Sequence, residues 1–517
     1  MEKIVENLRQ GNDVRANLIE ARQRLKQAGE KEFLKKLLAE TPDFIGELLH
    51  NEDPKVRKNA ALLMGDLRLE EMLDALYQTY LQEETLFIRK DYLKAMDQMN
   101  LSAYQQRLEQ RLEEMTHQEV SEENQKHYRE ELFVLRKIVL RNRKRKQHTF
   151  TGFGKKYDVI LTTNRNHREV TARQAEGKRV SMVPLGVKVQ EADLKQIMQI
   201  LTFRELLFLL DIQTVEAEPE KAAETLAGSD LLKLLEGAHD KTGILEGPAL
   251  SEVPERTLGT GKVIADPFYF RISVVGRMPL DKRSAFIKKI SFELEQRTGH
   301  RLVNTASDYE IEIRLVERKD GTFLPLVKLY TLKDERFSYR KESIAASIHP
   351  SEAAVIAALT KPYLKEKNQV LDPFCGVGTM LMERDRAVKA GSMYGIDIFG
   401  EAIQKARENT ALAGKEINYI NRDFFDFTHE YLFDEIFTNM PVRGKKTREE
   451  QDMLYQRFFE KASRVLKREG IMVLYSNEKG YIKKQIRLNE GWKLLKEFCM
   501  NEKEDFSVYV IKWMDSE

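Results

Sequence analysis

The fold is decided by the stretch "QVLDPFCGVGTMLMERDRAVKA" at residues 369–390. A strand-like apolar run ends at Asp372, and a turn with two glycines leads into a helix-like pattern. Phosphate groups, nicotinamide dinucleotides and S-adenosylmethionine (SAM) can all sit over such a strand–turn–helix unit. The spacing of the glycines discriminates between these ligands.

Two of the three ligands do not fit that spacing. A dinucleotide loop of the GxGxxG type needs a third glycine, and Leu381 stands where it should follow Gly376 and Gly378. A phosphate loop needs a lysine after its last glycine, and none follows here. The turn therefore favours SAM.

The octet "DPFCGVGT" (372–379) closely resembles the SAM loop of Rossmann-like RNA methyltransferases. The resemblance implies that Gly376 and Gly378 let backbone amides approach the amino-acid end of SAM, while Asp372 orders the loop. It also implies that Asp397 accepts the ribose hydroxyls and Asp423 the adenine amino group, since both follow predicted strands. The implied SAM contacts are Asp372, Phe374, Gly376, Gly378, Thr379, Asp397, Ile398, Asp423 and Phe424.

Strand-like and helix-like runs alternate from Lys367 onward, as a doubly wound α/β sheet requires. Together with this alternation, the resemblance of the octet implies a class I methyltransferase domain over residues 346–517. Its predicted strands are 369–375, 392–399, 417–427, 433–441 and 470–478, its helices 378–390, 400–414 and 453–466, and its closing hairpin 491–500 and 506–514.

The fourth predicted strand ends in "TNMPVRGKK" (438–446). The same family carries Asn/Asp-Pro-Pro-aromatic-Gly here, which aligns an exocyclic base amine with the methyl group and stacks on the flipped base. The resemblance makes Asn439, Met440 and Pro441 the catalytic residues. Val442 replaces the aromatic residue, and glycine comes one position late. Tyr455 is a candidate substitute for the missing ring.

Other chemistries find little support in the sequence. Methylation of a pyrimidine C5 needs a covalent cysteine, but Cys375 lies in the cofactor loop and Cys499 far along the tail. The nine histidines form no HExxH motif and no Cys/His cluster, so we expect no metal site.

The middle of the chain reads as an α+β region. After a β-rich run and a helix within 157–175, we expect a strand over 180–189 and a helix over 194–212, followed by a linker over 245–261. A strand over 268–279, a helix over 281–299 and two strands within 309–331 complete the region.

That order, with "FRI" (270–272) on a strand and "SYR" (338–340) after a hairpin, resembles THUMP-containing RNA methyltransferases. The resemblance implies a ferredoxin-like segment with its linker over 148–262 and a THUMP domain that grips structured RNA over 263–345. The main RNA-contact candidates are Arg277, Lys282, Arg283, Tyr339, Arg340, Arg443 and Lys445, and further ones are Arg271, Lys288, Lys289 and Lys341. Ordinary solvated surface is the alternative for each, and pairing with Glu449 and Glu450 is the alternative for the charges after Val442.

Residues 1–147 read as helix almost throughout. The segments 12–25, 53–67 and 86–99 each place an arginine at the head of an apolar stripe, which resembles HEAT-type repeats stacked as an α-solenoid. A plain helical bundle is the alternative. The basic run "RKIVLRNRKRKQ" (136–147) is either a solvated linker or a phosphate-contacting strip.

The whole chain of 517 residues is long enough for three to four domains. It has no apolar run of membrane-spanning length and no signal peptide, so no membrane is expected, and two separated cysteines suit a reducing cytoplasm. The predicted function is transfer of a methyl group from SAM to guanine N2 of ribosomal or transfer RNA, with the helical repeats recruiting RNA or a protein partner. The alternatives are a SAM- and RNA-binding protein impaired in catalysis, and a protein methyltransferase.

Overall fold

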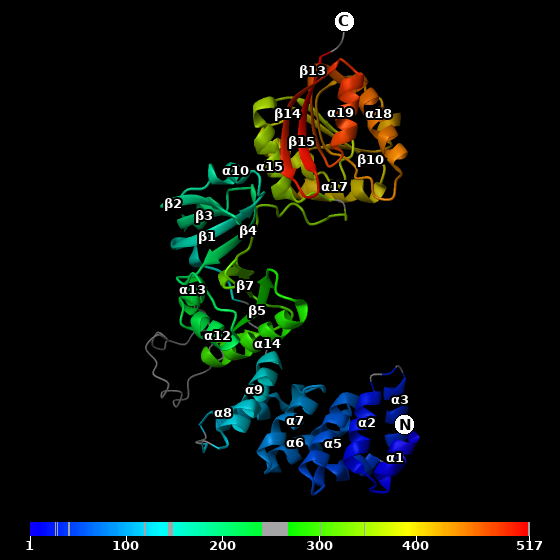
Figure 1. The fold of residues 1–517 in the computed structure, drawn as a ribbon. Helices are drawn as coiled ribbons and strands as arrows, with labels where there is room; N and C mark the ends of the chain where they lie inside the picture. Colours follow the sequence, from blue (N-terminus) through cyan, green and yellow to red (C-terminus); the bar gives the residue numbers. More distant parts are fainter. Residues whose placement is uncertain are drawn as a thin grey trace. The chain divides into compact units, whose positions relative to one another are not determined.

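The computed structural model describes residues 1–517 except 26, 28, 40, 41, 118, 119, 122, 143–147, 240–266, 300, 346 and 515–517. The described residues form two compact units, one before His148 and one from His148 onward (Figure 1). The predicted linker 245–261 and the end of the basic run 136–147 lie outside the described residues.

The first unit consists of helices whose contacts run from one helix pair to the next (Figure 1). Helix α2 contacts α1 and α5, α5 contacts α7, and α7 contacts α9, which also packs against α8. The helices are α1 (Glu2–Arg9), α2 (Val14–Arg24), α3 (Glu30–Ala39), α4 (Pro42–Glu47), α5 (Pro54–Leu67), α6 (Leu73–Gln82), α7 (Leu86–Met96), α8 (Gln105–His117) and α9 (Gln125–Asn142). The three similar sequence segments correspond to α2, α5 and α7.

Two of the arginines that mark these segments tie neighbouring helices together. Arg57 of α5 forms an ion pair with Glu83 at 2.7 Å and donates to the carbonyl of Asn51 at 2.8 Å. Arg89 of α7 lies 3.4 Å from Glu131 of α9, a carboxylate with no solvent exposure. The repeated arginine therefore has a structural use at these two positions.

The second unit begins with an eight-stranded sheet in the order β2-β3-β1-β4-β8-β7-β5-β6. Strands β4 and β8 pair antiparallel and so join the predicted segments 148–262 and 263–345 in one sheet. The elements are β1 (Lys156–Thr163), α10 (Arg168–Ala172), β2 (Arg179–Val183), β3 (Gly186–Asp193), α11 (Leu194–Ile197), β4 (Phe203–Leu209), α12 (Pro219–Ala227), α13 (Leu231–Ala238), β5 (Phe268–Val275), α14 (Leu280–Arg297), β6 (Leu302–Asn304), β7 (Ile311–Glu317) and β8 (Phe323–Leu329).

Two sequence predictions in this sheet were wrong. The predicted helix over 194–212 is only the short α11, after which the chain enters β4 between β1 and β8. In an apolar run of this length, the periodicity of the residues cannot distinguish a buried strand from a buried helix. The predicted single strand over 180–189 is the hairpin of β2 and β3, because the chain reverses before Gly186.

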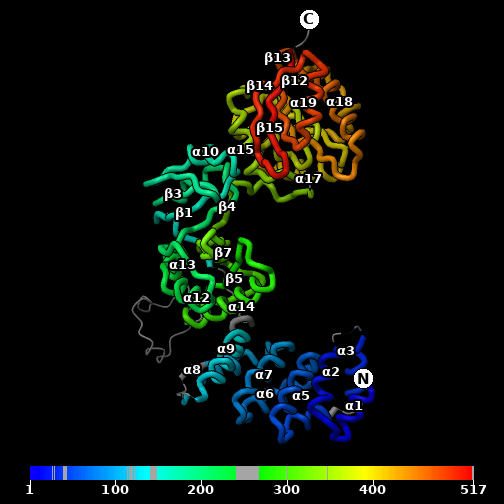
Figure 2. Tube along the Cα trace, in the orientation of Figure 1, coloured from blue at the N-terminus to red at the C-terminus, as the bar shows by residue number. Residues whose placement is uncertain are grey.

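The C-terminal part of the second unit, whose red end carries β13, β14 and β15 in Figure 2, forms a seven-stranded sheet in the order β11-β10-β9-β12-β13-β15-β14. Its first five strands are parallel, and β15 and β14 close it as an antiparallel hairpin. The strands are β9 (Gln369–Asp372), β10 (Ser392–Asp397), β11 (Asn418–Asn421), β12 (Phe433–Asn439), β13 (Leu466–Ser476), β14 (Trp492–Asn501) and β15 (Phe506–Trp513). The helices are α15 (Pro350–Thr360), α16 (Thr379–Ala387), α17 (Gly400–Leu412), α18 (Arg448–Val465) and α19 (Lys479–Leu488).

This topology fixes where a ligand can bind. Strand β9 has β10 on one side and β12 on the other, so the strand order reverses at β9. In open α/β sheets the crevice at the carboxyl ends of the strands, at such a reversal, is the usual ligand site. Helices α15 and α19 are absent from the sequence prediction, and the other elements of this region overlap their predicted ranges.

A buried ion pair anchors α16 to the sheet below the crevice. Arg384 donates to Glu435 of β12 at 2.9 and 2.6 Å, and neither side chain is exposed. Replacing Arg384 with methionine leaves the Glu435 carboxylate buried without its cation. We expect the free energy of unfolding of this unit to fall by about 3–5 kcal/mol in denaturant titrations.

The exposed pair of Arg464 and Glu460 is the matched control. Arg464→Met should lower the free energy of unfolding by less than about 1 kcal/mol, because solvent screens that pair. Combining Arg384→Met with Glu435→Leu should recover much of the loss. A small effect of Arg384→Met alone would show that the buried pair contributes little.

Candidate active site

A cavity of about 410 Å³ opens at the carboxyl ends of β9, β10 and β12. It is lined by every predicted cofactor and catalytic residue except Gly378: Asp372, Phe374, Gly376, Thr379, Asp397, Ile398, Asp423, Phe424, Asn439, Met440 and Pro441. These residues come from four strand ends and the turns after them. The fold therefore gathers at one crevice side chains that are far apart in sequence.

The glycine turn has backbone angles that favour glycine at two positions. Gly376 has φ of +52° and Gly378 has φ of +82°. A Cβ at Gly378 would lie 2.1 Å from the Tyr419 hydroxyl, whereas one at Gly376 would have its nearest neighbour, Ile344, at 3.8 Å. Gly378 is thus required by packing behind the loop, and Gly376 leaves backbone accessible on the cavity side.

Asp372 ends β9 and is completely buried. Its Oδ1 accepts hydrogen bonds from the Thr438 hydroxyl at 2.6 Å and from the Phe374 N–H at 3.1 Å. Burial raises the pKa of this carboxyl to about 7, although both donors oppose the rise. The second oxygen, Oδ2, has no hydrogen-bond partner among the described residues, and neither has the buried hydroxyl of Thr379.

The two oxygens without partners, Asp372 Oδ2 and the Thr379 hydroxyl, indicate whether the cavity suits a polar ligand. Buried polar atoms without partners destabilise a protein, so a group that supplies hydrogen bonds is expected beside them. The amino-acid end of SAM carries an ammonium and a carboxylate, which match a carboxylate and a hydroxyl. The cavity residues therefore fit this cofactor.

Asp397 at the end of β10 holds the glycine turn in place. Its Oδ2 accepts from the Gly376 N–H and its Oδ1 from the Phe399 N–H, both at 2.9 Å. Each carboxylate oxygen keeps a further lone pair, so ribose hydroxyls can still be accepted. Ile398 and Phe399 are 62% and 68% exposed, which leaves apolar surface beside the cavity.

The third strand end supplies two further predicted residues. The Asp423 carboxylate accepts the Phe425 N–H at 2.9 Å. Phe424 is buried and packs edge-on against Phe374, with ring centroids 6.0 Å apart. Phe424 therefore belongs to the core as well as to the cavity wall.

Asn439 is the last residue of β12. Its side-chain amide is unbonded within the described residues, and the backbone that follows it is held by hydrogen bonds. The amide makes no hydrogen bond within the described part of the chain, although the residue lines the cavity. The next two residues are held firmly: the Met440 N–H donates to the Tyr475 carbonyl at 2.9 Å, and the Pro441 carbonyl accepts from Gln451 at 3.1 Å. Such an amide can accept hydrogens from a substrate without first breaking a bond.

Tyr455 was the wrong choice as a base-stacking ring. It is fully buried on α18, where its hydroxyl bonds Ser476 at 2.7 Å and its ring stacks on Tyr481. The 18-residue helix places this ring on its core-facing side, as its periodicity allows. Val442 is 50% exposed.

Three of the main RNA-contact candidates are committed to contacts within the protein, and two of the further ones, Arg271 and Lys289, form ion pairs with Glu312 and Glu220. Tyr339 is buried and donates to Glu383 at 2.6 Å, so it offers no surface to RNA. Arg340 donates to the Ile348 carbonyl at 3.2 Å, and Arg283 donates to the Met278 carbonyl at 2.8 Å. "SYR" therefore docks the chain onto the methyltransferase region.

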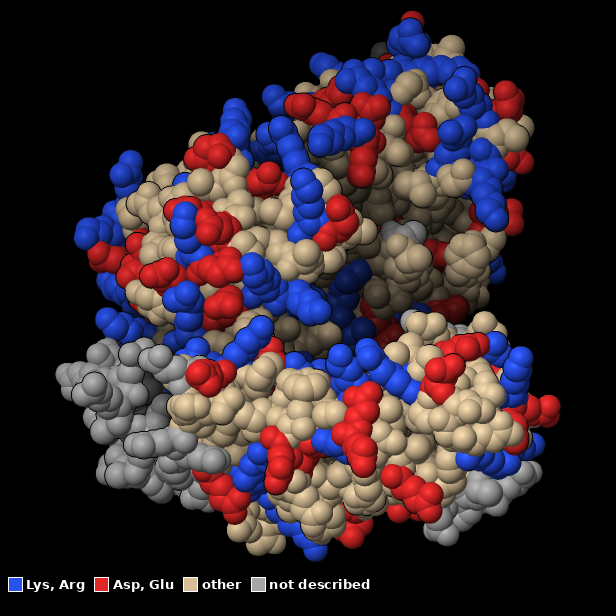
Figure 3. Space-filling view, turned by 60° about the horizontal axis from the view of Figure 1, so that its bottom comes forward, with Lys and Arg blue, Asp and Glu red and all other residues tan. Residues whose placement is uncertain are grey.

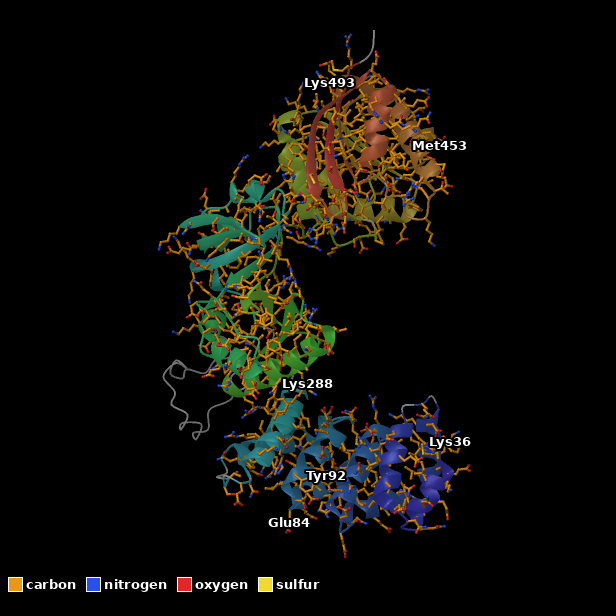
Figure 4. The ribbon with its side chains drawn as sticks, in the orientation of Figure 1. Lys36, Glu84, Tyr92, Lys288, Met453 and Lys493 are labelled. Atoms are coloured by element: carbon orange, nitrogen blue, oxygen red, sulfur yellow. The ribbon has the colours of Figure 1, made fainter. Side chains whose placement is uncertain are left out.

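The remaining cations of the set are exposed. Arg277, Lys282, Arg443 and Lys445 have exposed side chains, and within the described residues none of them forms an ion pair. Glu450 instead closes the N-terminus of α18 through a capping box with Thr447, so the predicted pairing alternative does not hold for it. Lys288 lies exposed on α14 (Figure 4).

We find neither a large patch of one charge on the face seen in Figure 3 nor a metal site among the described residues. Basic and acidic side chains are interspersed over the face seen in Figure 3, in keeping with a net charge of +2. In the described ranges, no group of three or more His, Cys, Asp or Glu could hold a metal ion. Nor does any described helix have the length and apolar character needed to cross a bilayer.

Cys375 has the environment of a packing residue. Its side chain is buried, and burial raises the pKa of the thiol well above its usual range, which disfavours the nucleophilic thiolate. We expect Cys375→Ala to keep methyl transfer within about threefold of the wild type, measured per folded molecule. A loss of several orders of magnitude in radiolabel transfer would instead indicate a covalent role.

Two supporting residues escaped the sequence reasoning. Thr438 orients the Asp372 carboxyl, and Gln451 holds the carbonyl that follows the catalytic turn. Thr438 adjoins Asn439, so the strand-four motif could have signalled it. Gln451 stands ten residues after Pro441, and its contact with the Pro441 carbonyl depends on how α18 packs.

Comparisons with known proteins agree with this geometry. Residues 338–506 match the family described as UPF0020, RMKL-like methyltransferase domain. The ribosomal protein L11 methyltransferase of Thermotoga petrophila is 22% identical over 197 residues, 37% of this chain and 70% of that protein. TrmN from Thermus thermophilus has a TM-score of 0.50 at 18% identity, over 69% of this chain and 99% of that chain. SMU.472, whose structure was solved with SAH, has a TM-score of 0.47 at 13% identity, over 70% of this chain and 99% of that chain.

The family match gives the class of chemistry for the residues that it covers. The region that matches the family is a SAM-dependent methyltransferase domain, and the likeness to TrmN shows the shared fold. The predicted class I methyltransferase-like α/β fold is thereby confirmed for the C-terminal region. S-adenosylmethionine is the cofactor, as predicted.

Proposed function

We propose that the chain transfers a methyl group from SAM to the exocyclic N2 amine of a guanine in structured ribosomal or transfer RNA. The observation that carries this proposal is the free amide of Asn439 at the edge of the cofactor cavity. An exocyclic base amine is a weak nucleophile because its lone pair is delocalised into the ring. Acceptors that orient its hydrogens therefore promote reaction.

Each residue of the strand-four turn has a part in the proposed reaction. SAM supplies an electrophilic methyl group bound to a sulfonium sulfur. The turn offers two acceptors for N2 hydrogens, the Asn439 side-chain carbonyl and the Met440 backbone carbonyl, and a hydrogen held there aims the nitrogen lone pair along the line of attack. Pro441, held by Gln451, stiffens the turn. As the carbon–nitrogen bond forms, sulfur keeps the electron pair of the broken bond and N2 releases a proton to solvent.

The other parts of the chain would provide RNA affinity. Four exposed cations that form no ion pair among the described residues suit phosphate contacts: Arg277, Lys282, Arg443 and Lys445. We take the middle sheet to include a THUMP-like RNA-binding part over 263–345. The stacked helix pairs of the first unit would form a HEAT-like solenoid that recruits RNA or a protein partner. The two separated cysteines favour the cytoplasm as the setting.

A protein substrate is the second candidate. It is favoured by the matched relative from Thermotoga petrophila, whose name gives ribosomal protein L11 as its substrate. A strand-four asparagine can align an amide or amine of a protein as well as a base. The nature of the product separates the two candidates.

Radiolabelled SAM with the full-length chain tests the proposal. Unmodified ribosomal and transfer RNA transcripts and purified ribosomal proteins would be offered separately, and the products digested with RNase or protease. We expect label that is sensitive to RNase and elutes as N2-methylguanosine. Protease-sensitive label would favour the second candidate, and SAM binding without turnover would point to impaired catalysis, the consequence suggested by Val442.

A further inference from the structure

A second cavity, of about 900 Å³, adjoins the cofactor cavity within the same unit. Asn439, Val442 and Ile348 line both cavities. The remaining walls come from the end of β1, the first turn of α15 and the turn between β14 and β15. A substrate in the larger cavity would therefore meet the cofactor at Asn439.

Building on the proposed function, we propose that this cavity is the pocket for the target nucleotide and that Glu352 selects guanine by accepting its N1–H and N2–H hydrogens. Glu352 is then a specificity-determining residue that contacts the substrate base. Each step of the assignment depends on a different wall of the cavity.

The first wall carries a shielded hydrogen-bond acceptor, Glu352, on which the charges of His167 and Arg204 act from beyond ion-pair distance. Glu352 is largely shielded from solvent, and its Oε1 accepts a hydrogen bond from the Asn164 amide at 2.8 Å. In the described part of the chain it forms no ion pair, and burial raises the pKa of its carboxyl. A shielded carboxylate that forms no ion pair destabilises the folded protein unless a ligand supplies hydrogen-bond donors to it.

Guanine is the base whose edge meets that need. Its N1–H and N2–H₂ are adjacent donors, which match the two oxygens of one carboxylate. Adenine carries an acceptor, N1, beside its amine. That acceptor would face the Glu352 carboxylate, which is also an acceptor, so no hydrogen bond could form there. With one N2 hydrogen on Glu352, the other remains for Asn439.

The second wall supplies the aromatic surface that Val442 lacks. Tyr475 and Phe506 line the cavity and stack on each other, with centroids 4.9 Å apart and an interplanar angle of 26°. Tyr475 is the register partner of Asn439 on the adjacent strand. A base in the cavity could pack against this ring pair, as bases do on aromatic platforms.

The third feature is a set of cations, which favours a nucleotide over a protein side chain. Arg165, Arg204 and Lys503 line the cavity with exposed side chains, and they have no ion pair among the described residues. Such groups match the phosphates that flank a nucleotide. They would repel a lysine side chain that Glu352 alone would attract.

Binding of three mononucleotides to the full-length protein tests the assignment without requiring turnover. GMP, IMP and AMP would be titrated in the presence of S-adenosylhomocysteine and followed by ligand-observed NMR. IMP differs from GMP only by the missing 2-amino group. We expect GMP to bind at least about tenfold more tightly than IMP or AMP, since a hydrogen bond to a charged group makes a contribution of that order.

Glu352→Gln should lower GMP affinity about tenfold and remove the preference. The fold should survive, because glutamine still offers an oxygen to Asn164. Glu366→Gln, exposed before the amino end of β9, changes the charge equally and should have no effect. Lys503→Glu should weaken all three nucleotides alike and leave their ranking unchanged.

Three outcomes would overturn the assignment: equal binding of the nucleotides, a preference for AMP, or a GMP preference that survives Glu352→Gln. Displacement of GMP by an acetyl-lysyl-amide peptide probe would overturn it in favour of a protein side chain. If the protein methylates guanine in RNA but shows one of these outcomes, the pocket assignment is wrong while the proposed function stands. Selective GMP binding without RNA methylation would instead contradict the proposed function.

Discussion

Replacing Asn439 with alanine is expected to lower kcat by about 10²- to 10³-fold, because a preorganised hydrogen-bonding group at the reacting atom contributes on that scale. The backbone of the turn should stay in place, since the Met440 N–H and the Pro441 carbonyl keep their own partners. The substrate amine then loses one acceptor, and its lone pair is no longer aimed. Single-turnover methyl transfer to the RNA substrate measures the effect.

The loss should fall on the chemical step and spare the cofactor. SAM affinity, measured by calorimetry, is expected to stay within about twofold of the wild type, because in the proposed reaction the amide bonds the substrate amine and not SAM. Asn439→Asp keeps an acceptor and should retain more activity than Asn439→Ala. Asn418→Ala, at the exposed start of β11, is the matched control. Full activity in Asn439→Ala would remove this residue from the mechanism.

The sequence predicted residues that the structure brings to one cavity, because local patterns encode their positions at strand ends. Strand ends at Asp372, Asp397 and Asp423 can be read from hydrophobic runs, and a parallel sheet brings all carboxyl ends to one edge. The glycine turn is likewise a local feature, fixed by two positive φ angles. No knowledge of tertiary packing was needed to place these residues together.

The substrate side depends on packing and was largely missed. Asn164 and Glu352 lie 188 positions apart and meet only because the end of β1 packs on the first turn of α15. Nothing in the local sequence around Glu352 distinguishes it from a first-turn acid that stabilises a helix. The predictions for Tyr455 and Tyr339 failed because tertiary packing buries both side chains in the core, where they cannot contact RNA. The helix predicted over 194–212 failed because a buried strand and a buried helix share composition.

Asp397→Ala is expected to weaken SAM binding by about a hundredfold. The substitution removes the acceptor for the Gly376 N–H and the Phe399 N–H together with the proposed acceptor for the ribose hydroxyls. Hydrogen bonds to a carboxylate contribute about 1.5–3 kcal/mol each, and about 1.4 kcal/mol corresponds to a tenfold change in affinity. Calorimetry of the full-length protein measures the change directly.

The controls separate loss of the ligand contact from loss of the fold. Asp426→Ala removes an exposed carboxylate that does not line the cavity, and it should bind SAM normally. Asp397→Asn keeps one acceptor for the turn and should fall between the wild type and Asp397→Ala. Normal binding by Asp397→Ala would show that the turn holds its shape without this carboxylate and that the ribose is bound elsewhere. Because Asp397 shapes the turn as well as the pocket, kcat should recover in Asp397→Ala at saturating SAM only if the turn re-forms around the ligand.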